Sequence, residues 1–331
     1  MDAIRRFLTE LGLPPGDAHD LPSSTKRFPD GAQYRVEIPS TEGPAALAAI
    51  LEEAERYGVT IHRVSQGSGV FLLTDDEIHA MATLAHAHGM EVSLFARPNA
   101  AWDTGAMARA SGGQTIAPRL RGQDQLVYCL EDVRRAAALG IRSVLLADEG
   151  ALWVAGKMRE QGLLPREMRF KISVQMASAN PASIRLMEQL GADTFNIPTD
   201  LTLAQIAAIR QAVAIPLDIY VEAPDDLGGF VRLYEIPEIV RIAAPVYIKF
   251  GLRNAPNIYP AGTHLESTAL ALSRERVRRA RLGLDLLARS MPEATTSRLG
   301  AEGLAIPVIE ASAEAAVEPA ARAGSHADGE R

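Results

Sequence analysis

The feature that most constrains the fold is a repeated β/α pattern between about residue 32 and residue 290 of the 331-residue chain. A short β-branched run is followed by a turn and an Ala- and Leu-rich segment of 3.6-residue periodicity, which is typical of βα units in a parallel sheet. Eight runs predict strands, at 34–38, 59–64, 91–96, 143–147, 170–175, 194–197, 217–221 and 246–250. Helices are expected after them, at 44–57, 75–88, 123–139, 149–162, 181–190, 202–213, 231–242 and 264–288.

Several of these helices carry start signals. Thr74 with Glu77 has the spacing of a capping box, and Asn180 before Pro181 predicts an N-cap followed by proline at the first helical position. Eight βα units in about 259 residues predict an α/β fold of the (βα)8 TIM-barrel type. A doubly wound open sheet is the alternative, but no strand is followed by a G-x-G-x-x-G turn, so we expect no NAD or flavin.

The chain is predicted to contain one domain with two extensions. Residues 1–30 form an N-terminal extension, residues 31–290 the barrel, and residues 291–331 a C-terminal tail that is rich in Ala and Glu. The tail has little hydrophobic periodicity, so we expect it to be disordered. The sequence has no run of about 18 apolar residues, so it gives no sign of a membrane span.

Composition narrows the class of function. The chain is 47% hydrophobic with a net charge of −7, so it can bury a large core and has no basic surplus for nucleic acid. Cys129 is its one cysteine, which excludes a disulfide framework and an iron–sulfur cluster held by several cysteines. These features favour a cytoplasmic protein with a small-molecule partner. A homo-oligomer is left open.

Alternation along the strands predicts an unusually polar barrel interior. In a closed barrel every second strand residue faces the barrel axis, and apolar neighbours such as Leu217 and Ile219 identify the face toward the helices. The expected inward set is Arg35, Glu37, Glu91, Ser93, Arg97, Lys171, Ser173, Gln175, Thr194, Asn196, Asp218, Tyr220, Glu222, Tyr247 and Lys249. Ordinary barrel interiors are dominated by Val, Ile and Leu. Charged residues near the strand starts (Arg35, Glu91, Lys171, Asp218) are expected to form a paired network.

Residues near the strand ends are the candidate active site, because ligands of TIM barrels bind at the C-terminal mouth. Arg97, Gln175 and Asn196 are expected to bind substrate. We predict catalytic roles for Glu222 and Lys249 in proton transfer. Lys249 is interpreted either as the counter-charge of Glu222 or as a Schiff-base nucleophile.

Loops around the mouth add further candidates. The long connection after the third strand carries Arg97, Arg109 and Arg119, and arginine forks suit an anionic substrate. Residues 65–69 (SQGSG) put Ser65 and Gln66 in a small-residue loop whose backbone a ligand could approach.

The connection after the last strand supplies Arg253 for substrate binding. It also supplies His264, the histidine that we would test for proton transfer. The cofactor is unknown. A divalent metal ion is left open, with Glu222 as its one candidate ligand, since no second carboxylate follows at a diagnostic spacing.

Three segments resemble the peptidase family U32 barrel: residues 173–177 (SVQMA) with Asn180 after them, residues 190–193 (LGAD) and residues 200–206 (DLTLAQI). The earlier residues 87–92 (AHGMEV) also look like the family's junction between its second helix and third strand. The resemblance implies a barrel with a site near Gln175 and Glu222. Two departures limit it. Residues 221–224 (VEAP) stand where the family usually has an H-G-A-type sequence, and the family's cysteine-rich segment is absent. The collagenase-like and the RNA- or quinone-hydroxylation roles are therefore not carried over.

The leading hypothesis is a barrel enzyme that performs lyase- or aldolase-type proton transfer on a small anionic metabolite. Hydrolysis of a small amide or peptide bond, as the resemblance implies, is the first alternative. A non-catalytic binding or accessory barrel is the second.

Overall fold

The computed structural model describes residues 2–10, 20–97 and 119–309. Eight strands form one closed parallel barrel in chain order, which confirms the predicted (βα)8 TIM-barrel fold. The strands are β1 (Tyr34–Pro39), β2 (Arg63–Ser65), β3 (Glu91–Phe95), β4 (Ser143–Leu146), β5 (Arg169–Ile172), β6 (Thr194–Asn196), β7 (Leu217–Glu222) and β8 (Val246–Phe250).

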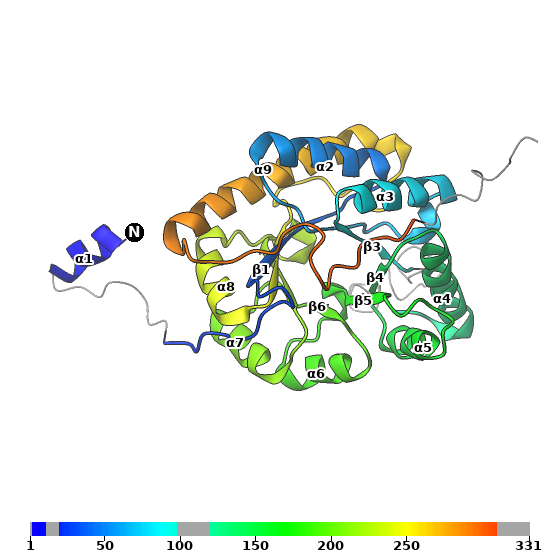
Figure 1. Ribbon diagram of the computed structural model, residues 1–331, viewed down its shortest axis with the longest axis horizontal. Coiled ribbons are helices and arrows are strands. Elements are labelled where there is room, and N and C mark those ends of the chain that lie inside the picture. The colour runs from blue at the N-terminus through cyan, green and yellow to red at the C-terminus, as the bar shows by residue number, and fades with distance from the viewer. Residues whose placement is uncertain (1, 11–19, 98–118, 310–331) are drawn as a thin grey trace, which may run out of the picture.

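Helices surround the barrel, as Figure 1 shows. Those that follow the strands are α2 (Pro44–Tyr57), α3 (Asp75–Ala87), α4 (Gly122–Ala138), α5 (Glu149–Glu160), α6 (Pro181–Gln189), α7 (Leu203–Ala212), α8 (Ile236–Ala243) and α9 (Glu266–Ser290). The helix α1 (Asp2–Glu10) lies apart from the barrel in the same view. None of the helices in the described ranges is both long and apolar enough to cross a membrane.

The predicted helix starts are present. Thr74 Oγ1 accepts from the backbone N–H of Glu77, whose carboxylate accepts from Thr74 N, so both halves of the capping box are made. Asn180 Oδ1 accepts from Ala182 N at 3.1 Å and from Ser183 N at 3.0 Å. These caps satisfy N–H groups that have no partner inside a helix, and they fix where each helix leaves its loop.

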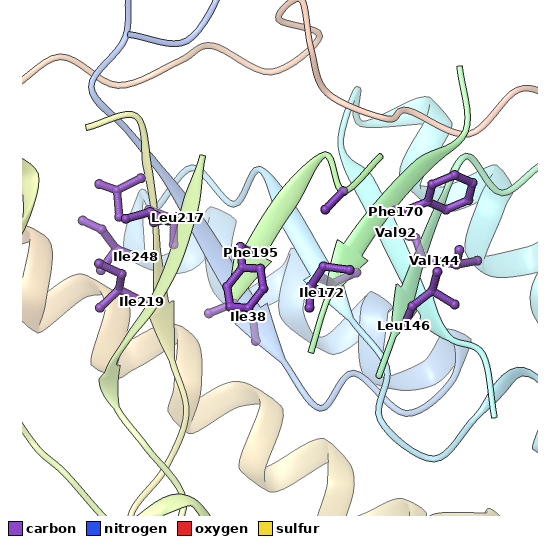
Figure 2. Packing of buried hydrophobic residues seen from close by; sticks show 14 of the residues in the cluster. Ile38, Val92, Val144, Leu146, Phe170, Ile172, Phe195, Leu217, Ile219 and Ile248 are labelled. Atoms are coloured by element: carbon purple, nitrogen blue, oxygen red, sulfur yellow. The ribbon is translucent and has the colours of Figure 1, made fainter. Parts of the chain in front are cut away.

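The hydrophobic core lies between the strands and the helices. Leu217, Ile219 and Ile248 are buried in this layer, and Figure 2 shows them on the same side of the sheet as Phe195 and Ile172. The predicted alternation is therefore correct for β7 up to Val221 and for β8. Its consequence is that the polar residues between them face the barrel axis.

The barrel floor is closed by a segment that we expected to be disordered. Residues 291–309 cross the N-terminal ends of the strands: Arg35 Nε donates to Ser297 Oγ at 2.8 Å, and Ala305 N donates to Glu91 Oε2 at 3.2 Å. The expected boundary at residue 291 is thus too early. The segment lacks periodicity because hydrogen bonds to the floor, not a helical or strand face, hold it in place. Residues 310–331 lie outside the described residues.

Candidate functional site

A network of buried charges fills the middle of the barrel. Glu37 on β1 is its centre and is fully buried. Glu37 Oε2 accepts from Arg63 Nε at 2.8 Å, and Arg63 Nη2 lies 2.5 Å from Asp218 Oδ1. Lys171 Nζ bonds Glu37 Oε1 and lies 3.2 Å from Asp218 Oδ2. Because buried charges are costly unless paired, this mutual pairing lets the barrel tolerate them.

Burial and neighbouring charge shift the titration of this network. Burial alone would raise the pKa of Glu37, but Arg63, Lys171 and Lys249 outweigh it and hold that pKa well below its usual range. Burial, with Arg63 close by, lowers the pKa of Lys171 to about 7. Glu37 is therefore a fixed negative charge, and Lys171 is the member of the pair that titrates more readily.

The expected floor network is present for three of its four residues. Glu91, Lys171 and Asp218 each lie within 4 Å of an opposite charge. Arg35 differs: within the described part of the chain it bonds Ser297, Tyr247 and Glu302 O, and it stacks 4.0 Å above the Phe28 ring. Its charge is held by carbonyl, hydroxyl and aromatic groups.

Arg63 is a central residue that sequence reasoning missed. It contacts Glu37, Asp218 and, at 3.6 Å, Glu91, and its guanidinium lies 3.5 Å above the Tyr247 ring. The signal was present, because Val64 packs toward the helices and its neighbours Arg63 and Ser65 must then face inward. The expected inward set contains no residue of that strand.

Lys249 forms the upper edge of the network. Its Nζ lies 3.4 Å from Glu37 Oε1 and 4.2 Å from the centroid of the Tyr220 ring. In the amide orientation that satisfies both ends, Asn196 Oδ1 accepts from Lys249 Nζ at 2.7 Å and Nδ2 donates to Asp218 O at 3.0 Å. The amine is thus held at a fixed point on the barrel axis.

A pocket opens above Lys249 at the C-terminal mouth. Six of the expected site residues line it: Ser65, Gln66, Arg97, Gln175, Asn196 and Lys249. Phe95, Tyr220 and Tyr259 supply aromatic walls. Gln175 does not lie on β5 as predicted, because that strand ends at Ile172. It lies instead in a 3₁₀ turn, η4 (Val174–Met176), where its side chain is exposed at the rim of the pocket.

Arg97 is the second cation of this pocket. It is 6% exposed, and its guanidinium lies 4.1 Å above the Phe95 ring. Burial lowers its pKa to about 10, against smaller opposing effects of Tyr259 and Glu42. The pocket therefore has cationic groups at its base and its wall, with aromatic and uncharged polar side chains between them. Arg109 lies outside the described residues.

Glu222 does not reach the pocket. The pairing of β7 with β8 is irregular between Tyr220 and Glu222, so that Tyr220 faces Lys249 in the register and Glu222 faces Phe250. One extra residue turns the side chain of Glu222 to the outer face. There it accepts from Arg253 N at 3.1 Å and lies 3.8 Å from Arg279 on α9. The expected pairing of Glu222 with Lys249 is wrong.

Three other candidates lie away from the pocket lining. Arg119 pairs with Glu149 at the start of α5, and Arg253 is exposed with Asp225 3.8 Å away. His264 is exposed at the start of α9. None of the three lines the pocket that holds Lys249.

The small-residue loop after β2 is already occupied. Glu42 Oε1 accepts from Gly67 N at 2.7 Å, and its Oε2 accepts from Ser68 N at 3.1 Å. The side chain of Gln66 bonds Gly69 at both N and O. The backbone N–H groups that we expected a ligand to approach therefore bind the protein's own carboxylate and amide. Across the described ranges, no group of three His, Cys, Asp or Glu side chains is arranged to hold a metal ion.

Fold and site define a TIM barrel with a charged interior and an open pocket at its C-terminal mouth. Residues 120–223, about a third of the chain, match the model of peptidase family U32. The U32 resemblance is thus confirmed from the start of α4 to the end of β7, and the chain is U32-like in that part.

Similar solved structures are distant. The U32 peptidase Mk0906 is 16% identical with a TM-score of 0.35, over 63% of this chain and 73% of that one. A native KDPGal structure is 11% identical with a TM-score of 0.42, over 80% and 99%. Oxaloacetate acetylhydrolase with its product oxalate is 10% identical with a TM-score of 0.45, over 80% and 85%. These likenesses carry no argument about activity. No curated protein matches the sequence.

Proposed function

We propose that this barrel is a lyase- or aldolase-type enzyme that acts on a small anionic carbonyl compound at its mouth. The observation that carries the proposal is the Lys249 amine at the base of the pocket, held by Glu37 at 3.4 Å and by Asn196 at 2.7 Å. An amine held at the base of a pocket is suited to carbonyl chemistry. Arg97 and Gln175 line the same pocket and would contact the polar groups of the substrate.

In the proposed reaction the Lys249 ammonium first gives a proton to water at the open mouth, and the resulting amine adds to the carbonyl carbon. Both hydrogens of the amine leave with the carbonyl oxygen as water, and an imine remains. Once protonated, that imine makes the neighbouring C–H or C–C bond easier to break, because its nitrogen accepts the electron pair. Asp226 also lines this pocket and would exchange protons with the substrate; burial raises its pKa.

The test is hydrogen exchange beside the carbonyl. Wild-type protein and Lys249→Met are incubated in D2O with a panel of 2-oxo acids, and deuterium at the adjacent carbon is followed by NMR. We expect exchange with at least one compound, and a loss of about 100-fold or more in the variant. Lys157→Met, an exposed lysine on α5, is the matched control. Equal exchange rates in wild type and Lys249→Met would contradict the proposal.

A hydrolase of small amide or peptide bonds is the second candidate, because residues 120–223 match a peptidase family. It is distinguished by the product: new amino termini released from a peptide mixture, in a reaction that Lys249→Met does not abolish. Saturable binding of oxo acids without turnover of any compound would favour the accessory-protein alternative.

A further inference from the structure

A second pocket lies beside the mouth, beneath the connection from β8 to α9. Residues 255–259 of that connection cover it. It shares Ser40, Asp226 and Tyr259 with the Lys249 pocket, so the two spaces adjoin. Neither the sequence analysis nor the proposed reaction assigns it a role.

Arg276 on α9 reaches into this second pocket with an unbalanced charge. It is 5% exposed, and its Nε has no hydrogen-bond partner. In the described part of the chain its one hydrogen bond runs from Nη1 to Ser40 O at 3.3 Å, and the Glu42 carboxylate acts on it only electrostatically, without a hydrogen bond. Every arginine inside the barrel network has a carboxylate partner or, like Arg35, several acceptors.

A buried guanidinium with one carbonyl partner is unfavourable by itself, since the charge has lost its water without gaining a direct ion pair. Burial accordingly lowers the pKa of Arg276, although Tyr259, Glu42 and Tyr220 oppose it. A bound anion would offset this unfavourable burial, because it would give the guanidinium a charged hydrogen-bond partner. A guanidinium offers two parallel N–H groups that match a carboxylate or a phosphate.

The lining favours the carboxylate. Asp225 and Asp226 face the same pocket as Arg276, and a dianion would feel their repulsion about twice as strongly as a monoanion. We propose that Arg276 binds a carboxylate group of the substrate in the second pocket, which adjoins the pocket that holds Lys249. This inference rests on the proposed function for the identity of the substrate, but the carboxylate site itself can be tested alone.

The experiment follows arginine Nε–H signals by NMR in the full chain labelled with 15N-arginine. Arg276→Lys identifies the Arg276 signal by its loss. Sodium acetate and sodium pyruvate are titrated against sodium phosphate at constant ionic strength. The control is Arg210 on α7, which is 2% exposed with Nε also unpartnered, but which lies at the floor, where Lys26 bonds its carbonyl.

We expect both carboxylates to shift the Arg276 signal saturably and leave that of Arg210 in place. Arg276→Lys should weaken pyruvate binding about 10- to 100-fold, as for the loss of a charge-assisted pair. The inference is overturned if acetate and pyruvate leave Arg276 unmoved, if they move both arginines alike, if phosphate alone moves Arg276, or if Arg276→Lys binds pyruvate as wild type does.

Lys249→Met separates this inference from the proposed reaction. A saturable Arg276 shift that survives in Lys249→Met supports the carboxylate site whether or not Lys249 reacts. If Lys249 fails to react while the Arg276 signal still shifts, only the proposed reaction at Lys249 is contradicted. If Lys249 reacts with pyruvate and Arg276 stays unmoved, only the carboxylate site is wrong.

Discussion

Glu37 and Lys249 are direct register partners on β1 and β8, and Lys249 Nζ lies 3.4 Å from Glu37 Oε1. The same oxygen also bonds Lys171, and the other oxygen bonds Arg63. One carboxylate therefore balances three buried cations from different strands. Any change to Glu37 should act on the whole interior and on the amine at the pocket base.

We predict that Glu37→Gln destabilises the protein by about 3–5 kcal/mol, because it leaves buried cations without their counter-charge. Urea denaturation measures the difference in the free energy of unfolding. Glu52→Gln is the control, since Glu52 pairs with Arg274 at the surface, where such a pair contributes at most about 1 kcal/mol. Similar losses in the two variants would contradict the role assigned to Glu37.

Stability should fall as the pH drops from about 6.5 to about 4 because of His62. His62 Nδ1 accepts from Val36 N at 3.0 Å, and its Nε2 lies 2.7 Å from Ser297 O. Burial, with Arg35 nearby, lowers the pKa of His62 to about 4. In this window the unfolded chain binds a proton that the folded chain does not, so stability decreases on acidification, by at most about 3 kcal/mol.

His62→Gln cannot titrate, so its unfolding free energy should change less with pH over this window than that of wild type. His88→Gln, at an exposed position, is the control. Parallel pH curves for wild type and His62→Gln would contradict the assignment. Below about pH 4.5 a further loss of stability is expected from Glu37. Its pKa is lowered in the folded protein, so its carboxylate stabilises the fold only while it stays ionised.

Glu222→Gln should leave carbonyl chemistry at Lys249 within about twofold of wild type. The carboxylate faces Arg253 N and Arg279 on the outer side of β7, and it does not line the pocket that holds Lys249. Some stability should be lost, about 1–3 kcal/mol, since glutamine still accepts from Arg253 N but lacks the buried charge that faces Arg279. Oxo-acid exchange rates and urea denaturation measure the two effects. A 100-fold loss of exchange with unchanged stability would restore Glu222 to the site.

Glu222 also shows where sequence reasoning has to fail. Alternation correctly predicted the inward residues Asp218 and Tyr220 on β7 and Lys249 on β8, because a regular strand fixes parity. The irregular pairing after Tyr220 turns Glu222 to the outer face instead of the inner one. No residue type in 221–224 predicts this irregularity. Arg276 lies on a helix, so strand parity could not find it. The closure of the floor by 291–309 depends on long-range hydrogen bonds that leave no periodic pattern.

Gly283→Ala tests the packing of α9 against the barrel. A Cβ there would lie 2.6 Å from the Phe250 ring and 2.8 Å from Ile236 Cδ1. Alanine normally stabilises a helix relative to glycine by up to about 1 kcal/mol, but here the clash should prevail and cost about 1–3 kcal/mol. Thermal unfolding checks the sign. The neighbour Leu282, 41% exposed, gives the control Leu282→Ala, expected within about 0.5 kcal/mol of wild type.

The most direct test of the central claim is reductive trapping of Lys249. The protein is incubated with pyruvate and other 2-oxo acids in the presence of borohydride, and the modified residue is located by peptide mass spectrometry. The account predicts one adduct, on Lys249, that disappears in Lys249→Met and persists in Lys157→Met. No adduct with any oxo acid, or an adduct that survives in Lys249→Met, would contradict it.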